Sequence, residues 1–362
     1  MNLSRFKRNR NWVFVFICFL LLQQSNFVYA KESKDIPSKA YFIKYGYEQN
    51  QKIGYLDKDI LSKDITVKST NKSCRYQENP SGNLVADAYL YTAKNIENQQ
   101  GENVSFSLVS DAALFGGLKK GSVTTGDCFN LLENAYIQNK ILTNPLLVVY
   151  LSGEDLLNIF EMSTTVPKTM SQLNFSESGL LYTYNPNRFL FSKVIKLETY
   201  DEKDRLDKAK LYSVAMDYFT AKQIQTIKAN SYGLIDVVLK NQNGTEIKDL
   251  TQVMIKQKNR NIESWESIAI YLKSLSPEQE AKNEGSNVIK KYQKPQGKIE
   301  IYNSKNINDI FKNPSSYMKL FFGIFAISAM LIIFLLFLIR RLILQIVHYR
   351  EQFYEIKNKI DK

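Results

Sequence analysis

The chain has 362 residues, and its 48 Lys and Arg against 36 Asp and Glu give a formal net charge of +12. A hydrophobic content of 44% and an aromatic content of 12% exclude a chain that is disordered throughout. The single histidine, His348, excludes a Ser–His or Cys–His catalytic pair and a His-rich metal site in the rest of the chain. We therefore expect no catalytic residue, no metal ligand and no cofactor.

The first 30 residues have the pattern of a secretory signal peptide. Four basic residues precede an apolar run at 12–22, and the small side chains of Val28 and Ala30 mark a cleavage site after Ala30. An uncleaved signal anchor is the alternative. Residues 31–52 are polar and without periodicity, and we expect a linker there.

Residues 53–303 alternate between strand and helix patterns without a strict βαβ rhythm. The patterns predict helices at 83–91, at 156–162 and within 220–275, strands at 104–109, 146–151 and 211–215, a hairpin from 182–191 and 194–197, and a loop at 274–291. Strand 146–151 is apolar throughout and is expected to be buried on both faces. These elements indicate an α+β fold, a layered sandwich of mixed sheet and covering helices.

A second apolar segment lies near the C-terminus. Residues 320–339 carry no charge, and 20 residues at ~1.5 Å each match the ~30 Å hydrocarbon core of a bilayer. Arg340 and Arg341 follow at once, and positive residues stay on the cytoplasmic side. We expect a juxtamembrane linker at 304–319, a transmembrane helix at 320–339 and a cytoplasmic tail at 340–362, although a buried core helix is the alternative. The chain would then be a single-pass type I protein of the cell membrane, its bulk periplasmic or extracellular.

The charge is concentrated near the two ends of the chain. The basic residues before the first apolar run and the tail after Arg340 leave only +5 of the +12 for the region between them. A nucleic-acid-binding protein needs a clustered basic face. No nucleic-acid partner is expected.

Two cysteines remain once Cys18 leaves with the signal peptide, namely Cys74 and Cys128. An exported compartment permits a disulfide between them. Two buried free thiols fit the sequence equally well.

Several motifs, which follow one another in a fixed order along the chain, resemble the motifs of one protein family. Residues 74–88 read C-R-Y-Q-E-N-P-S-G-N-L-V-A-D-A, with Arg75 and Glu78 in an Arg-x-x-Glu pair ahead of Gly-Asn-Leu-x-x-Asp-Ala. This segment resembles the opening signature of the C-terminal, substrate-binding domain of 5'-nucleotidases and UDP-sugar hydrolases. Further blocks follow in the family's order, at 114–124, 126–127, 144–153, 179–184, 212–218 and 295–299. The resemblance spans roughly residues 53–303.

The resemblance implies the layered 5'-nucleotidase C-terminal fold and a division of labour. In that family an N-terminal metallophosphatase domain carries two metals and hydrolyses the substrate, while the C-terminal domain binds the nucleotide. The metallophosphatase motifs have no counterpart in this sequence. A separate metallophosphatase chain is therefore one expected partner.

The substrate residues that the resemblance implies are mostly altered. Arg75 matches a family Arg that contacts an anionic group, and Asn144 matches an Asn that contacts the base. Other family positions are changed: the family's Asn stands as Ser110, its Arg as Phe115, and its two stacking aromatics as Leu142 and Ile224. Lost stacking costs ~1–3 kcal/mol per base, so nucleotide affinity is expected to be low. For Arg75 and Asn144 a structural role is the alternative to substrate binding: Arg75 would form a salt bridge to Glu78, and Asn144 would form a turn before Pro145.

Two functions fit these observations. The first is a membrane-anchored, extracytoplasmic binding module with a degenerate nucleotide site and no catalysis of its own. The second is the substrate-binding subunit of a split 5'-nucleotidase, completed by the separate metallophosphatase. The ligand is not identified by the sequence.

Overall fold

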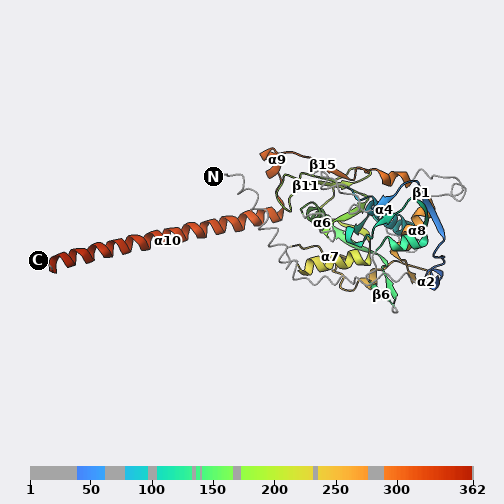
Figure 1. Ribbon diagram of the computed structural model, residues 1–362, viewed down its shortest axis with the longest axis horizontal. Coiled ribbons are helices and arrows are strands. Elements are labelled where there is room, and N and C mark those ends of the chain that lie inside the picture. Colours follow the sequence, from blue (N-terminus) through green and yellow to red (C-terminus); the bar gives the residue numbers. More distant parts are fainter. Residues whose placement is uncertain are drawn as a thin grey trace. The chain divides into compact units, whose positions relative to one another are not determined.

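The computed structural model describes residues 39–61, 78–96, 104–132, 136–138, 141–165, 173–230, 235–275 and 289–360. Figure 1 shows the path of the chain, with helices as coiled ribbons and strands as arrows. The largest sheet of the described residues is mixed and four-stranded, in the order β8-β12-β3-β9. Strands β8 (Leu146–Ser152) and β12 (Leu211–Asp217) pair antiparallel, β12 and β3 (Phe106–Ser110) pair parallel, and β3 and β9 (Phe175–Ser178) pair antiparallel. The predicted strands at 104–109, 146–151 and 211–215 are confirmed. Alternate residues of β8 are only half-buried, so the expectation of burial on both faces is wrong.

Helix α4 (Pro80–Asn95) packs against β3, β9 and β12 and contains the predicted helix at 83–91. Its start follows from the local sequence, because Asn79 accepts a hydrogen bond from the N–H of Gly82 and Pro80 occupies the first turn. Gly82 is required by close packing, since a Cβ there would lie 2.0 Å from Ser176 Oγ of β9. The Gly-Asn-Leu signature is thus the point where this helix meets the sheet.

Among the described residues that follow α4 in the domain, the α-helices are α5 (Thr125–Asn130), α6 (Gly153–Thr165), α7 (Tyr218–Asn230) and α8 (Ser264–Leu275). Helix α6 covers the predicted segment 156–162 and packs on β8, β9 and β11, while α8 packs on α4 and α5. Helices α7 and α8 are those expected within 220–275. Of the loop expected at 274–291, residues 276–288 lie outside the described residues.

A second sheet has the order β11-β10-β15. Strands β10 (Leu180–Tyr184) and β11 (Val194–Thr199) form the predicted antiparallel hairpin, and β15 (Ile299–Ile301) adds to β10 in parallel. The first strand ends at Tyr184, so its predicted extension to residue 191 is wrong. Gly179 joins β9 to β10 with φ of +86°, a backbone conformation that favours glycine.

Four two-stranded sheets complete the described strands. They are β1 (Lys52–Leu56) with β5 (Gly121–Thr124), β2 (Ile60–Leu61) with β4 (Gly117–Leu118), β6 (Tyr136–Gln138) with β7 (Ile141–Thr143), and β13 (Lys256–Gln257) with β14 (Arg260–Asn261). Together with the two larger sheets they give a mixed α+β fold of the expected class.

Residues 39–51 differ from the linker that their irregular pattern predicts. Helix α2 (Lys39–Lys44) buries Tyr41 and Phe42, whose rings contact Phe129 and Trp265. Trp265 is 1% exposed, and its indole N–H donates to the Tyr41 hydroxyl at 3.1 Å. Packing against distant aromatic residues orders this segment, although it has too few residues to show a helical period.

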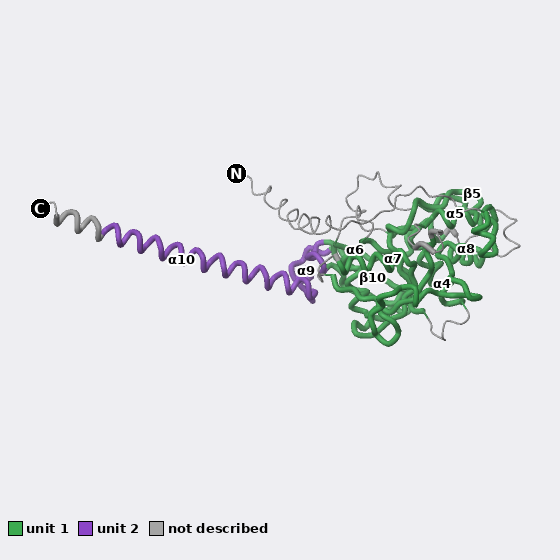
Figure 2. Tube along the Cα trace, turned by 90° about the horizontal axis from the view of Figure 1, so that it is seen from below, with its two compact units in different colours: residues 1–186, 193–303 green, residues 187–192, 304–362 purple. Residues whose placement is uncertain are grey.

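The chain divides into two compact units (Figure 2). The first unit consists of residues 1–186 and 193–303. The second unit consists of residues 187–192 and 304–362. Within the second unit, Arg188 Nη2 donates to the carbonyl oxygens of Lys312 (2.5 Å) and Asn313 (3.1 Å), and the Phe311 ring contacts Phe189 and Phe322. These contacts order part of the stretch expected to be a juxtamembrane linker, which also contains the short helix α9 (Ile307–Phe311).

Helix α10 (Ser316–Ile360) has 45 residues and contains the predicted segment 320–339. Within it, 316–351 is long and apolar enough to cross a membrane by length and composition, and the side chains of its apolar window are exposed. The helix continues through the predicted tail to Ile360.

Candidate functional site

The ends of β3, β7 and β12 meet at the start of α7, and this meeting point holds two of the predicted substrate residues. Ser110 is fully buried at the end of β3, where its N–H donates to Thr220 Oγ1 at 2.9 Å and its Oγ accepts from the N–H of Ala112. Asn144, directly after β7, is 1% exposed, and its Oδ1 accepts from the N–H of Phe219 at 2.9 Å. The structure therefore brings Ser110 and Asn144 to one place, as the resemblance implies, but their polar atoms bond to the protein itself.

Asp217, the last residue of β12, joins these groups into one network. Its side chain is fully buried and accepts from the Tyr89 hydroxyl (2.9 Å), from the N–H of Thr220 (2.6 Å) and from Thr220 Oγ1 (3.1 Å). Asn144 also hydrogen-bonds to it through its side chain. Burial raises the pKa of Asp217, and these donors act in the opposite direction by favouring its ionised form.

Glu263 extends the network toward α2. Its Oε2 accepts from the N–H of Asn144 and its Oε1 from the Tyr45 hydroxyl, each at 3.0 Å. Burial raises the pKa of Glu263 to about 7, while the two donors lower it by a smaller amount. We name Ser110, Asn144, Asp217, Thr220, Tyr89, Glu263 and Tyr45 the strand-end network.

The remaining predicted substrate residues lie in different surroundings. Ile224 lies on α7 and is 2% exposed, so it is a core residue rather than the open wall of a slot. Phe115 follows the short helix at 111–113 and is 59% exposed. Leu142 lies in β7, and its side chain is outside the described part, as is Arg75 with its expected salt bridge.

Of the two cysteines, Cys128 is a buried free thiol on α5, and burial raises its pKa. Cys74 lies outside the described residues, so a bridge between the two stays a prediction.

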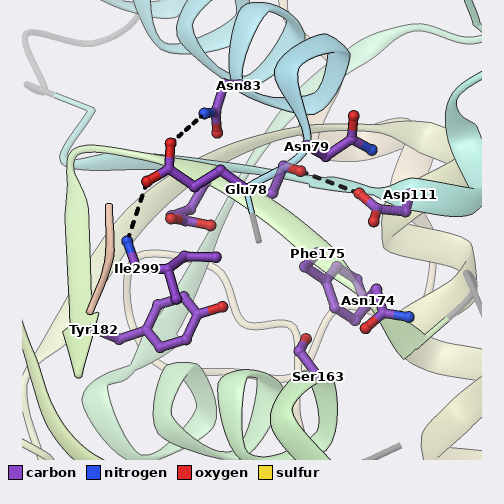
Figure 3. Close-up of a pocket in the computed structure, with 11 residues that line it drawn as sticks. Glu78, Asn79, Asn83, Asp111, Ser163, Asn174, Phe175, Tyr182 and Ile299 are labelled. Atoms are coloured by element: carbon purple, nitrogen blue, oxygen red, sulfur yellow. Dashed lines mark hydrogen bonds between the residues drawn. The ribbon is translucent and has the colours of Figure 1, made fainter. Parts of the chain in front are cut away.

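A small cavity lies between the N-terminus of α4, the loop after β3, β9 and β10 (Figure 3). Its volume is about 40 Å³. Eleven residues line it, and they include three carboxylates, three amides and several apolar side chains: Glu78, Asn79, Asn83, Asp111, Ser163, Asn174, Phe175, Ser176, Glu177, Tyr182 and Ile299. No lysine or arginine is among them, so the lining is rich in hydrogen-bond acceptors.

The three carboxylates of the cavity are satisfied to different degrees. Glu78 accepts from Asn83 Nδ2 at 3.0 Å (Figure 3). It also accepts from the N–H groups of Gln296 and Lys298. Asp111 accepts from Ser176 Oγ at 3.1 Å. Glu177 is 2% exposed, and its Oε1 is buried without a hydrogen-bond partner. Burial raises the pKa of Glu177 to about 8.

Sequence analysis did not single out Asp217, Glu263 or Glu177. Asp217 ends a strand in a block that carries the resemblance, and a carboxylate after an apolar strand is a usable signal. Glu177 lies in the sequence F-S-E-S, which is typical of a half-exposed strand, but in the structure β9 packs against α4 and α6 and Glu177 is 2% exposed. Local sequence gives no sign of that burial.

Comparison with known families gives one match, described as 5'-nucleotidase, C-terminal domain, over residues 52–229. Among solved structures, a 5'-nucleotidase precursor from Thermus thermophilus aligns at 20% identity over 70% of this chain, with a TM-score of 0.47. The Haemophilus influenzae NAD nucleotidase aligns at 13% identity over 71%, with a TM-score of 0.44. This chain covers 40% and 39% of those two proteins. No curated protein matches.

Proposed function

Because residues 52–229 form a 5'-nucleotidase C-terminal domain, we propose that this chain is a membrane-anchored binding module on the outer side of a membrane, without catalysis of its own. The domain type supplies the binding role, since in the family it contacts the nucleotide. The apolar stretch 316–351 of α10 supplies the anchor.

One observation above all supports the loss of family-type nucleotide binding. Ser110 and Asn144, at two positions that bind substrate in the family, are committed to buried hydrogen bonds of the strand-end network. A ligand that recruited their side chains would have to replace the bonds that Ser110 Oγ accepts from the N–H of Ala112 and Asn144 Oδ1 accepts from the N–H of Phe219, and each lost buried bond costs ~1–3 kcal/mol. Across the described ranges, moreover, no group of three His, Cys, Asp or Glu side chains could hold a metal ion.

The direct test measures hydrolysis and binding with the full chain in detergent micelles. We expect no release of phosphate from AMP or UDP-glucose with Mn²⁺, Mg²⁺, Zn²⁺ or Co²⁺, and no rise in Tm with millimolar AMP. A catalytically complete 5'-nucleotidase in the same micelles is the positive control. Metal-dependent turnover that disappears in a point variant of this chain would contradict the proposal.

A second experiment distinguishes this proposal from the alternative, a split nucleotidase. Affinity purification of the full chain from its native membranes should recover no metallophosphatase. If one co-purifies, and the complex hydrolyses nucleotides while neither chain does so alone, then this chain is a substrate-binding subunit.

Protease protection tests the proposed orientation. Protease added outside intact cells or spheroplasts should digest the domain and leave α10 with its tail, because Arg340 and Arg341 favour the cytoplasmic side. A tag fused after Lys362 should stay protected. Digestion of the tag with survival of the domain would reverse the orientation.

A further inference from the structure

The cavity beside β9 is lined by an acidic side chain, Glu177, whose buried Oε1 has no hydrogen-bond donor. Lys298 is the nearest candidate, but its buried ammonium bonds to Asp87 Oδ1 at 3.0 Å and to the main-chain carbonyl of Glu177 at 2.7 Å. Within the described ranges no ion pair reaches the Glu177 side chain. A buried carboxylate oxygen without a donor is costly, and this one belongs to a residue that lines open space.

The lining favours an organic cation over a metal ion. Its carboxylates do not converge as metal ligands, since the described residues contain no group able to hold a metal. An ammonium group donates three hydrogen bonds in separate directions and can therefore serve acceptors that are spread apart. The lining also has apolar parts: Phe175, Tyr182 and Ile299 lie around the same opening (Figure 3). They suit the carbon atoms next to the charge, and an aromatic face attracts a cation.

The volume sets an upper limit on the ligand. About 40 Å³ is roughly three times the ~10–15 Å³ that one water needs by the same measure. An ammonium group with one or two carbons fits this space, whereas a nucleoside does not. The cavity is thus distinct in chemistry from a nucleotide site.

We propose that this cavity binds the ammonium group of a small primary amine, with Glu177 Oε1 as its central acceptor and Asp111 and Tyr182 beside it. The alkyl part of the amine lies against Phe175 and Ile299. The site shares no residue with the strand-end network and needs no nucleotide. The test of this proposal is therefore separate from the test of the proposed function.

A protonated, purely structural Glu177 is the competing account, and proton release separates the two. Burial, together with the nearby charges of Glu78, Asp111 and Asp87, raises the pKa of Glu177 to about 8, while Lys298 lowers it. The side chain is therefore largely protonated at pH 7 without a ligand. A bound ammonium favours the carboxylate, so binding must release a proton, and the affinity must rise with pH up to about 8.

Calorimetric titration of the full chain in detergent micelles with ethylammonium chloride tests the site at constant ionic strength. We expect saturable binding and, at pH 7, a heat that depends on the buffer because a proton is released. Glu177→Gln removes the charge but keeps the shape, and it should weaken binding at least tenfold. Glu202→Gln, at an exposed carboxylate, is the matched control and should bind as the parent does.

Three outcomes would overturn the proposal. One is unchanged ethylammonium binding by Glu177→Gln. Another is an equal response to tetramethylammonium, which has no N–H donors, or to K⁺, because either would show a general cation effect. The third is binding without proton release at pH 7, a measurement on the parent chain that holds even if the variant fails to fold.

Discussion

Ser110 and Asp111 are neighbours at the end of β3, yet they face two polar regions of opposite character. Ser110 joins the strand-end network, where Asp217 accepts four hydrogen bonds and Glu263 accepts two. Asp111 lines the cavity, where the buried Oε1 of Glu177 accepts none. Both regions are acidic and buried, so burial and charge alone do not separate a structural network from a binding site.

The two regions differ in whether their buried acceptors already receive hydrogen bonds from the protein. Where the protein supplies every donor, the polar residues fix the positions of strands and helices and have little capacity left for a ligand. Where a buried acceptor has no donor within the protein and a cavity lies beside it, a ligand can supply the missing hydrogen bond. The free energy of unfolding of the chain in micelles measures this distinction, with tryptophan fluorescence as the signal, since Trp265 is buried in the core.

Asp217→Ala should have the largest effect. It leaves the Tyr89 hydroxyl and the N–H of Thr220 buried without acceptors, so we expect a loss of about 3 kcal/mol or more. At about 2–4 °C per kcal/mol for a domain of this size, Tm should fall by roughly 6–12 °C. Asp201→Ala, at an exposed position, is the control and should stay within ~0.5 kcal/mol. An equal effect in the two variants would contradict the structural role of the network.

Glu177→Gln should act in the opposite direction, with a gain that grows as the pH rises from about 4.5 to about 8. The raised pKa means that the folded state holds a proton which the unfolded chain releases near pH 4.5, so stability falls as pH rises from about 4.5 to about 8. Removing the acid should raise stability at pH 9 by a few kcal/mol and leave it nearly unchanged at pH 4.

Glu263 and Asp217 remain in that variant and retain part of the same slope, since their pKa values are raised too. The measurement is therefore the difference between the parent and Glu177→Gln from pH 4 to pH 9. A difference that does not depend on pH would show that Glu177 titrates normally.

Restoring a family aromatic at Ile224 should be destabilising. Ile224 is 2% exposed, so Ile224→Phe overpacks the core at a cost of about 1–3 kcal/mol. Phe115→Arg, at a side chain that is 59% exposed, should change stability by less than ~0.5 kcal/mol. If Ile224→Phe is tolerated and millimolar AMP then raises Tm, the slot is open and the nucleotide site can be recovered.

Ser110→Ala should have the smallest effect, a loss of about 0.5–1 kcal/mol. The variant removes the oxygen that accepts the N–H of Ala112 but keeps the main-chain bond to Thr220. Ser122→Ala, at an exposed position of β5, is the matched control. A loss as large as that in Asp217→Ala would mean that the Ser110 hydroxyl carries more of the network than its one described bond suggests.

Much of the fold could be predicted because its signals are local. Asn79 and Pro80 predict the start of α4, and runs of apolar residues predict β8 and β12. Helix α2 could not be predicted, since its order depends on Phe129 and Trp265, both distant in sequence.

The candidate site divides in the same way. The resemblance names Ser110 and Asn144 as altered or retained substrate positions, and in the structure both lie near the start of α7. It could not show that their hydrogen bonds are already used. Nor could it reveal Glu177, whose burial arises from elements that meet only in the folded domain.

Helix α10 runs from Ser316 to Ile360 without a proline and with Gly323 as its only glycine. An α-helix turns about 100° and rises about 1.5 Å per residue, so every residue of this rod has a fixed angular phase relative to every other. Inserting one residue after Arg341 would rotate everything downstream by about 100°, whereas inserting seven would bring it back to within about 20°. The tail is therefore coupled in rotation to the apolar stretch before it, and its length in residues determines which way its side chains face.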